Sequence, residues 1–373
     1  MKRIVYPAGV LLVGMAAAHL LFTLLIYRSD IALHAATTAL KQAGYLVVPN
    51  AHVLPSLTRI FPAFCGALFF TLTTGAGLCL LAFFAAWGKK RLFPKSRIYR
   101  LCLVAAWLAV VLAGNAGGLN LEATAAAAVI APLVFFLTRK WMPGAPLRGQ
   151  WWAVGVHVIV VVVVALAWVP RLDRDVFINV RDYLLMTHPA GQAVNAFYYR
   201  YTLYPAEVFK SPAQKLLTPV RLTGVSDADT RRQIAQQLAG SDYLPVADTE
   251  DAWRVHVDKT DGALLFADSR GPVLETDLDQ FFNRPEKILQ RFSRQSDTAG
   301  VLRQFTFFSL LGALPLSLYV LAHGLFGGLL VFIRRVPVKS LLASLLCLAI
   351  GLGAVWPLYG IAPGLLSKSE IGQ

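Results

Sequence analysis

Long apolar runs are the feature that most limits how this chain of 373 residues can fold. A helix rises about 1.5 Å per residue, so about 20 apolar residues are needed to cross the roughly 30 Å hydrocarbon core of a bilayer. Runs of about this length or longer occupy residues 6–27, 61–87, 101–118, 121–138, 151–169, 304–333 and 341–359. The sequence therefore predicts an α-helical polytopic membrane protein with about seven transmembrane helices.

The composition excludes several other classes of protein. Apolar residues make up 56% of the chain and charged residues 15%, whereas soluble domains carry about 25% charged residues. An ordinary soluble enzyme and a disordered chain are both excluded. The four cysteines lie within or at the ends of apolar runs and form no C-x-x-C pair. They indicate core packing, so neither a disulfide framework nor a zinc site is expected.

One stretch is large enough to hold a soluble core of its own, residues 170–303. It separates the first five predicted helices, in residues 1–169, from the last two and a short tail, in residues 304–373. Within it, a helix is expected over 226–240 and another over 276–296, because capping residues precede both and a glycine ends the first. Between them, residues 252–267 read as a hairpin turning at Asp261-Gly262. This pattern predicts a small, mostly helical α/β domain.

The formal net charge of +14 is unevenly distributed. Cytoplasmic segments of membrane proteins are rich in Lys and Arg. If the N-terminus is inside, the inner segments carry fourteen basic residues and no acidic one: Lys2, Arg3, Lys89, Lys90, Arg91, Lys95, Arg97, Arg100, Arg139, Lys140, Arg148, Arg334, Arg335 and Lys339. The charge pattern predicts a multi-pass inner (plasma) membrane protein with a cytoplasmic N-terminus, an extracytoplasmic 170–303 domain and an extracytoplasmic C-terminus. It also removes the reason to expect nucleic-acid binding.

Two of the apolar stretches, residues 6–27 and residues 101–138, have a second interpretation. The first follows Met-Lys-Arg and contains Ala16-Ala17-Ala18, as a cleavable signal peptide would, but its apolar run continues through Ile26, which favours a retained anchor. Residues 101–138 are too long for one crossing and fit two helices joined by a hairpin at 114–120. A re-entrant loop there would return to the same side.

Three histidines, His19, His157 and His323, are expected about 13–17 Å from a membrane surface, near the midplane. Ionisable groups at this depth are costly unless they face the bundle interior, which makes them candidate functional residues. Three roles remain open: a proton or substrate pathway, ligation of haem b or a metal, and structural hydrogen bonds. No cofactor or metal is predicted, and haem b stays an alternative.

Glu122 is the other ionisable residue near lipid. It lies at the outer end of its predicted helix, close to Asn115, Asn120 and Thr124. A carboxylate there can bind a cation or take up protons. The simpler interpretation is that it marks the end of the span in water.

The sixth predicted span is about 45 Å long as a continuous helix, well beyond the bilayer core. Gly312 and Pro315 in its outer half predict a kink, which would couple the soluble domain to the bundle. Gly324 and Gly328 form a small-xxx-small pair that would allow close helix packing.

An aromatic stripe follows the fifth predicted span. Phe197, Tyr201 and Tyr204 recur on one helical face. The stripe either lies in the headgroup layer of the bilayer, where such side chains are favourable, or packs against the protein's own helices, which is the favoured interpretation.

The chain contains no Walker A loop, H-E-x-x-H, G-x-S-x-G or dinucleotide fingerprint, which disfavours an ATPase, a zinc protease and an α/β-hydrolase. The leading hypothesis is an integral inner-membrane subunit of an envelope transport or export assembly, whose 170–303 domain recognises a protein partner or substrate. A membrane scaffold or receptor is one alternative. A redox subunit using haem b or quinone, or a lipid-linked transferase, is another, although the sequence leans against an enzyme.

Overall fold

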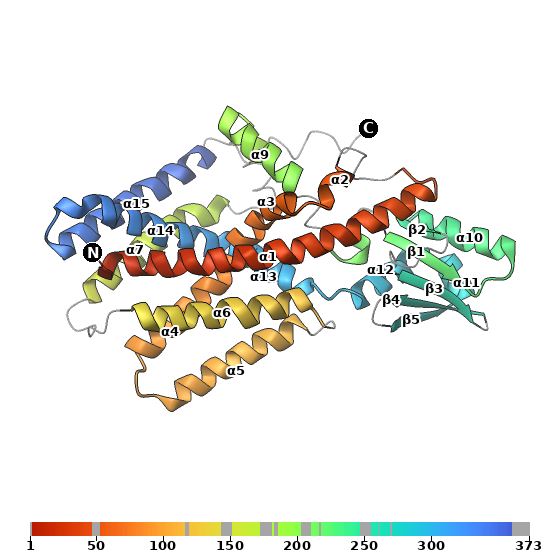
Figure 1. The fold of residues 1–373 in the computed structure, drawn as a ribbon, viewed down its shortest axis with the longest axis horizontal. Coiled ribbons are helices and arrows are strands. Elements are labelled where there is room, and N and C mark those ends of the chain that lie inside the picture. The colour runs from red at the N-terminus through yellow and green to blue at the C-terminus, as the bar shows by residue number, and fades with distance from the viewer. Residues whose placement is uncertain are drawn as a thin grey trace.

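The computed structural model describes residues 2–46, 53–115, 119–142, 151–171, 181–182, 186–202, 210–215, 218–246, 255–260, 262–268 and 271–359. It is mostly helical with one small sheet, as predicted (Figure 1). The helices of the first half are α1 Lys2–Gln42, α2 Leu54–Leu57, α3 Ile60–Phe70, η1 Thr71–Gly75, α4 Ala76–Arg91, α5 Arg97–Gly114, α6 Leu121–Trp141 and α7 Trp151–Trp168, which the short turn η2 Val169–Arg171 extends. Those of the second half are α9 Pro189–Tyr201, η5 Pro212–Gln214, α10 Ala228–Ala239, α11 Leu278–Asn283, α12 Pro285–Gln295, α13 Gly300–Phe308, η6 Ser309–Ala313, α14 Leu314–Leu329, η7 Leu330–Phe332 and α15 Val336–Tyr359.

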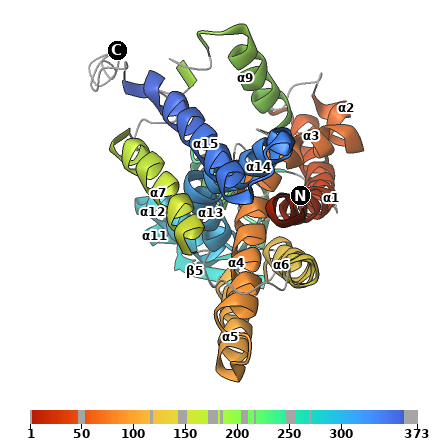
Figure 2. The same cartoon turned by 90° about the vertical axis from the view of Figure 1, so that its left-hand side faces the viewer.

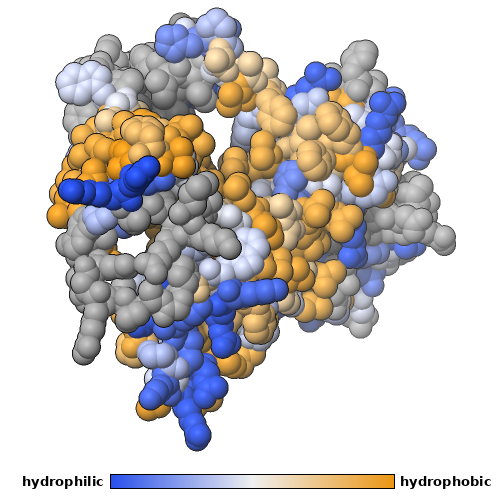
Figure 3. Space-filling model, turned by 60° about the vertical axis from the view of Figure 1, so that its left-hand side comes forward, coloured by the Kyte–Doolittle hydropathy of each residue, from blue (hydrophilic) through white to orange (hydrophobic). Residues whose placement is uncertain are grey.

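Six of the seven predicted spans form helices long and apolar enough to cross a membrane, within the described part of the chain. They are Tyr6–Gln42, Ile60–Arg91, Arg97–Gly114, Ala123–Trp141, Gly300–Phe332 and Pro337–Trp356. The predicted fifth span forms α7, whose apolar part Val154–Trp168 is shorter. Hydrophobic residues cover much of the surface seen in Figure 3, and most of the exposed large hydrophobic side chains belong to these helices. The structure therefore supports a membrane protein by the length and composition of its helices.

Helix α1 organises the bundle. It packs along α3, α6 and α14, and its buried side chains form one core with those of α3, α4 and α6 (Figure 2). Close approach is possible because small residues line the contacts: a Cβ on Gly14 would lie 2.5 Å from Val134 and 2.8 Å from the Cys79 sulfur. Helix α5 lies at the edge, against α6 and α4, and α7 pairs with α15.

The first helix is longer than predicted. The apolar run ends at Tyr27, but α1 continues to Gln42, which makes it about 61 Å long. Its last turns are anchored on residues 218–295, which hold the sheet described below and which we call the sheet region. Leu40 is buried against Leu244 and Val246, and the Tyr45 hydroxyl donates to the Pro245 carbonyl at 3.0 Å. The hydropathy of the sequence identified only the segment of this helix that suits lipid. The helix continues past that segment because its last turns pack on the sheet region.

A five-stranded sheet forms the core of the sheet region, in the order β2-β1-β3-β4-β5. Its strands are β1 Thr218–Thr223, β2 Tyr243–Pro245, β3 Val255–Thr260, β4 Ala263–Asp268 and β5 Gly271–Asp277. The predicted hairpin is β3–β4, which are paired antiparallel, whereas β1 is parallel to both β2 and β3. Three aromatic rings fill the interior: Phe266 packs on Phe281 of α11 and Phe292 of α12 at centroid distances of 5.8 and 5.5 Å.

The N-terminus of α10 supplies a test of pH dependence. The Asp227 carboxylate accepts hydrogen bonds from the Thr230 hydroxyl, the Thr230 amide and the Asp229 amide. These hydrogen bonds, with the one from the Thr230 hydroxyl contributing most, hold the pKa of Asp227 below its usual range. A carboxyl with a lowered pKa stabilises the fold above its unfolded pKa of about 3.9 and loses that contribution as the pH falls further. We expect amide protection of α10 to decrease below about pH 4.

Asp227→Asn is the matched control, since asparagine caps helices as well as aspartate but does not titrate there. Hydrogen exchange of residues 228–239 is compared in the two proteins at each pH. The acid loss of protection should be smaller in the variant, and identical pH profiles would contradict the assignment.

Candidate intramembrane site

The helix over Gly300–Phe332, which we name the central helix, carries polar groups into the interior of the bundle. It consists of α13, the π-helical segment η6, α14 and the short turn η7, and it packs against α1 and α4 on one side and α15 on the other (Figure 2). Beyond Arg303 and Gln304 near its start, its polar side chains are Thr306, Ser309, Ser317, Tyr319 and His323. Because polar groups are costly in lipid, their contacts mark where function can reside.

Two of the three predicted histidines meet. His157 of α7 and His323 of α14 are in edge-to-face contact with ring centroids 4.8 Å apart. The His157 Nδ1 lies 2.6 Å from the Tyr319 hydroxyl and 3.4 Å from the hydroxyl of Ser344, which is fully buried. The His323 Nε2 lies 3.5 Å from the Ser340 hydroxyl. These five residues, from α7, α14 and α15, form what we call the histidine cluster.

The chemistry of the histidine cluster suits the transfer or binding of a proton or a small polar group. A neutral imidazole has one donor and one acceptor nitrogen, and tyrosine and serine hydroxyls both donate and accept. Two hydrogen-bonded pairs of such groups, Ser340 with His323 and His157 with Tyr319, meet where the two imidazole rings are in contact. Imidazole can take up and release a proton. Direct contact between the two rings leaves no space for a porphyrin between them, so the arrangement does not suit bis-histidine haem ligation by this pair.

A second polar group lies where two π-helical segments meet. η1 interrupts the helix Ile60–Arg91, η6 interrupts the central helix, and the two segments contact each other. Thr74 and Thr306 join them, with hydroxyl oxygens 2.7 Å apart. The Thr306 hydroxyl donates to the Leu302 carbonyl at 2.8 Å, so the shared hydrogen belongs to Thr74. We call this contact the π seam. π-Helical turns are rare and are frequent at functional sites.

The third histidine adjoins the π seam. His19 Nδ1 lies 2.9 Å from the Thr71 hydroxyl, which itself donates to the Ala67 carbonyl at 2.8 Å. With its one hydrogen committed, Thr71 accepts, and His19 Nδ1 carries the proton. The His19 ring also packs edge-on against Phe64 at 4.3 Å. His19 therefore holds α1 on η1 and lies apart from the other two histidines.

The predicted kink and packing residues occupy distinct places. Gly312 lies within η6, and Pro315 is the second residue of α14, where a missing N–H is tolerated. A Cβ on Gly324 would lie 2.7 Å from the Ala8 Cβ, so α14 and α1 are in close contact there. A Cβ on Gly328 would meet no atom within 4 Å among the described residues.

The residues around Glu122 are engaged in capping and turn contacts. Asn120 caps α6 by accepting from the Ala123 amide at 2.8 Å, and its side chain donates to the Thr298 carbonyl at 3.1 Å. Asn115 donates to the Thr124 hydroxyl at 2.8 Å. The Glu122 side chain lies outside the described structure. Asn120 thus ties α6 to the start of the central helix.

The aromatic stripe contacts the protein itself. Phe197 and Tyr201 pack on each other with centroids 5.0 Å apart, and Tyr201 packs edge-on against Phe61 at 6.4 Å. Tyr204 lies outside the described residues. The two rings that can be placed are half-buried between α9 and α3.

Sequence reasoning missed two polar features. The three threonines of η1, Thr71, Thr73 and Thr74, are all buried. In the sequence, only their clustering within an apolar run could have drawn attention to them. Asp30 in the second half of α1 is 1% exposed, and its Oδ1 has no hydrogen-bond partner among the residues described. In the sequence, Asp30 could have been noticed because it is the only acidic residue before Glu122.

Comparisons with protein families, curated proteins and solved structures give no match for this chain. Across the described ranges, no group of three or more His, Cys, Asp or Glu side chains is placed to hold a metal ion.

Proposed function

We propose that this chain is an integral inner-membrane subunit of an envelope transport or export assembly, with the histidine cluster in its path. One observation carries the proposal: the central helix begins beside the sheet region and brings polar groups to both the π seam and the histidine cluster. At its start, Arg303 is paired with Asp297, with Nη1 2.9 Å from Oδ1. A displacement of the sheet region would therefore be transmitted along one helix into the bundle.

The orientation of the proposed subunit places its N-terminus in the cytoplasm. The start of α1, the α4–α5 connection and the start of α15 lie at one end of the long axis, and the sheet region lies at the other (Figure 1). The first of these ends carries the basic residues that favour the cytoplasm. On this orientation residues 170–303 form an extracytoplasmic domain, whose role is to recognise a protein partner or substrate.

The scaffold alternative is weaker because anchoring a domain does not require buried polar groups. Hydroxyls and imidazoles in a bilayer are costly unless they have partners or line a cavity. A transport subunit gives a reason to keep Tyr319, His323 and Ser344 together at that cost. The redox and transferase alternatives have no comparable support in the described residues.

Cysteine labelling tests whether the histidine cluster lines a water-accessible path. In a chain whose four native cysteines are replaced by alanine, Ser340→Cys and Ser344→Cys are expected to react with a water-soluble thiol reagent applied to membranes. Leu345→Cys is the matched control, since Leu345 neighbours Ser344 but is 48% exposed on the surface of the bundle. Labelling of both serine positions no faster than the control would contradict the path.

A functional test separates transport from anchoring. We expect His157→Ala/His323→Ala to lose the activity that restores a strain lacking the gene, while Val158→Ala on the outer face of α7 retains it. Membrane content and elution of the variants are compared with the wild type. Full restoration by the double variant would overturn the proposal and favour a scaffold.

A further inference from the structure

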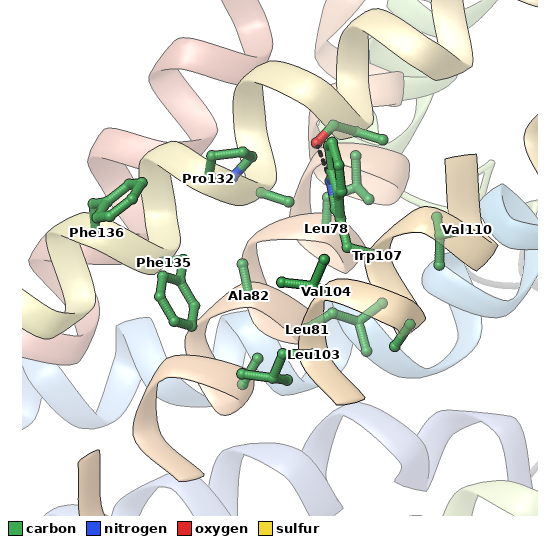
Figure 4. A pocket seen from close by; sticks show the side chains of 14 residues that line it. Leu78, Leu81, Ala82, Leu103, Val104, Trp107, Val110, Pro132, Phe135 and Phe136 are labelled. Carbon is green, nitrogen blue, oxygen red and sulfur yellow. Dashed lines mark hydrogen bonds between the residues drawn. The ribbon is translucent and has the colours of Figure 1, made fainter. Parts of the chain in front are cut away.

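An apolar cavity of about 490 Å³ opens between α4, α5 and α6 (Figure 4). Its walls include Leu78 and Ala82 of α4, Val104 and Trp107 of α5, and Phe135 of α6. Trp107 links the two outer walls, because its indole N–H donates to the Ala127 carbonyl at 3.1 Å. The volume lies within the roughly 300–1,000 Å³ range of ligand pockets.

The cavity exists because α5 packs loosely. Gly114 at its last turn is the only residue of α5 that is buried, among those described. Most of its other side chains are exposed, and several of them line the cavity. A void in a bilayer loses dispersion contacts, so hydrocarbon chains are the natural occupant of this space.

A cluster of positive charge adjoins one end of the cavity. Arg100 lies one helical turn before Leu103 and Val104, and Arg139 lies one turn after Phe135. The Arg139 guanidinium is 5.9 Å from the centre of the Phe135 ring. The start of α5, which carries Arg100, and the end of α6, which carries Arg139, both approach the end of α4. Lys89 Nζ lies 3.0 Å from the Ser96 carbonyl oxygen, and Lys90 Nζ lies 2.9 Å from the Arg139 carbonyl oxygen.

The lysines in this cluster are already engaged. Lys89 Nζ donates to the carbonyls of Phe93, Pro94 and Ser96 at 2.9–3.0 Å. Lys90 Nζ donates to the carbonyls of Arg139 and Met142. These contacts fix the α4–α5 connection and the end of α6, and they leave the guanidinium groups of Arg100 and Arg139 exposed.

No carboxylate in the first 172 residues can neutralise this cluster. Asp30 and Glu122 are the only acidic residues there. Glu122 precedes Arg139 by 17 residues on α6, about 25 Å along the helix. Gly9 of α1 packs on Trp141, at the basic end of α6, so Asp30 lies about 31 Å farther along α1.

We infer that this groove binds an anionic phospholipid of the surrounding bilayer, with an acyl chain between α4, α5 and α6 and the phosphate at Arg100 and Arg139. Guanidinium groups bind phosphate through paired, charge-assisted hydrogen bonds. Basic pockets between transmembrane helices are a recognised arrangement for anionic headgroups. The site is separate from the histidine cluster, so it stands whether or not the chain transports.

Native mass spectrometry of the full chain in detergent, titrated with phosphatidylglycerol or phosphatidylcholine, tests the site. We expect phosphatidylglycerol to bind at least about tenfold more tightly, and Arg100→Gln/Arg139→Gln to remove most of that preference. Arg334→Gln/Arg335→Gln, which removes the same charge from another connection, should keep it. Arg100→Lys/Arg139→Lys retains the charge and should give an intermediate preference.

The hydrocarbon half of the site is tested by filling the groove. Val104→Trp should weaken binding of both lipids, whereas Val158→Trp, at an equally exposed position on α7, should not. Variants are compared only where elution and melting temperature match the wild type. Equal affinity for the two lipids, unchanged preference in the arginine-to-glutamine variant, or a second copy of the chain seated in the groove in place of lipid would each overturn the inference.

Discussion

Phe292→Ala will destabilise the sheet region by about 3–5 kcal/mol, the usual cost of removing a large buried aromatic side chain. The Phe292 side chain is fully buried, and its ring packs on Phe266 and, with a centroid distance of 6.4 Å, on Tyr243. The ring holds α12 against β4, and α12 leads directly into the central helix. The cavity left behind would be lined by aromatic rings that cannot easily collapse into it.

Hydrogen exchange of the full-length protein in detergent measures the effect. Protection in β3 and β4 should fall by an amount corresponding to that free energy. Phe282→Ala is the control, because Phe282 is adjacent to the core but only partly buried, and it should lose much less. Undiminished protection of both strands in the Phe292 variant would show that α12 does not support the sheet.

Gly77→Leu will open the π seam and lower the stability of the bundle by about 1–3 kcal/mol, the usual cost of overpacking. A Cβ at Gly77 would lie 2.2 Å from the Ser309 hydroxyl oxygen, 3.1 Å from the Ser309 Cβ and 2.9 Å from the Phe305 ring. Only glycine therefore lets α4 approach the central helix at this level. A leucine must push η6 away, which also separates Thr74 from Thr306.

A second substitution, at Ser309, tests whether the contact between Gly77 and Ser309 causes the loss of stability. Gly77→Ala alone should lower the melting temperature, and adding Ser309→Gly should restore part of it, because the hydroxymethyl group that clashes is removed. Gly328→Ala serves as the control, since its Cβ would meet no described atom within 4 Å. Additive effects of the Gly77 and Ser309 substitutions would show that these residues do not share a contact.

Local patterns predicted some single elements well, whereas the one helix expected over 276–296 is the end of β5 followed by two helices, α11 and α12. The β3–β4 hairpin follows from Asp261-Gly262, which favours a tight turn between two alternating segments. β1 was not predicted, because no local turn joins it to its partners β2 and β3, which are far along the chain. Parallel pairing depends on the whole domain and leaves little local signal.

The candidate site shows the same division. The sequence identified His157 and His323 as costly groups in lipid, but their pairing depends on how α7, α14 and α15 are rotated about their axes. Rotation is set by close contacts such as Gly324 on Ala8 and Gly351 on Val164. His19 has the same expected depth, yet its helix turns it toward Thr71.

By itself the sequence determined which segments form apolar helices and where positive charge concentrates in short connections, because the cost of placing a side chain in hydrocarbon or water is nearly a property of that residue alone. Only the tertiary structure decided that α1 extends to the sheet, that two π-helical segments meet, and that an apolar cavity ends at Arg100 and Arg139. These features depend on the packing of surfaces from distant parts of the chain, and packing is a property of pairs of helices.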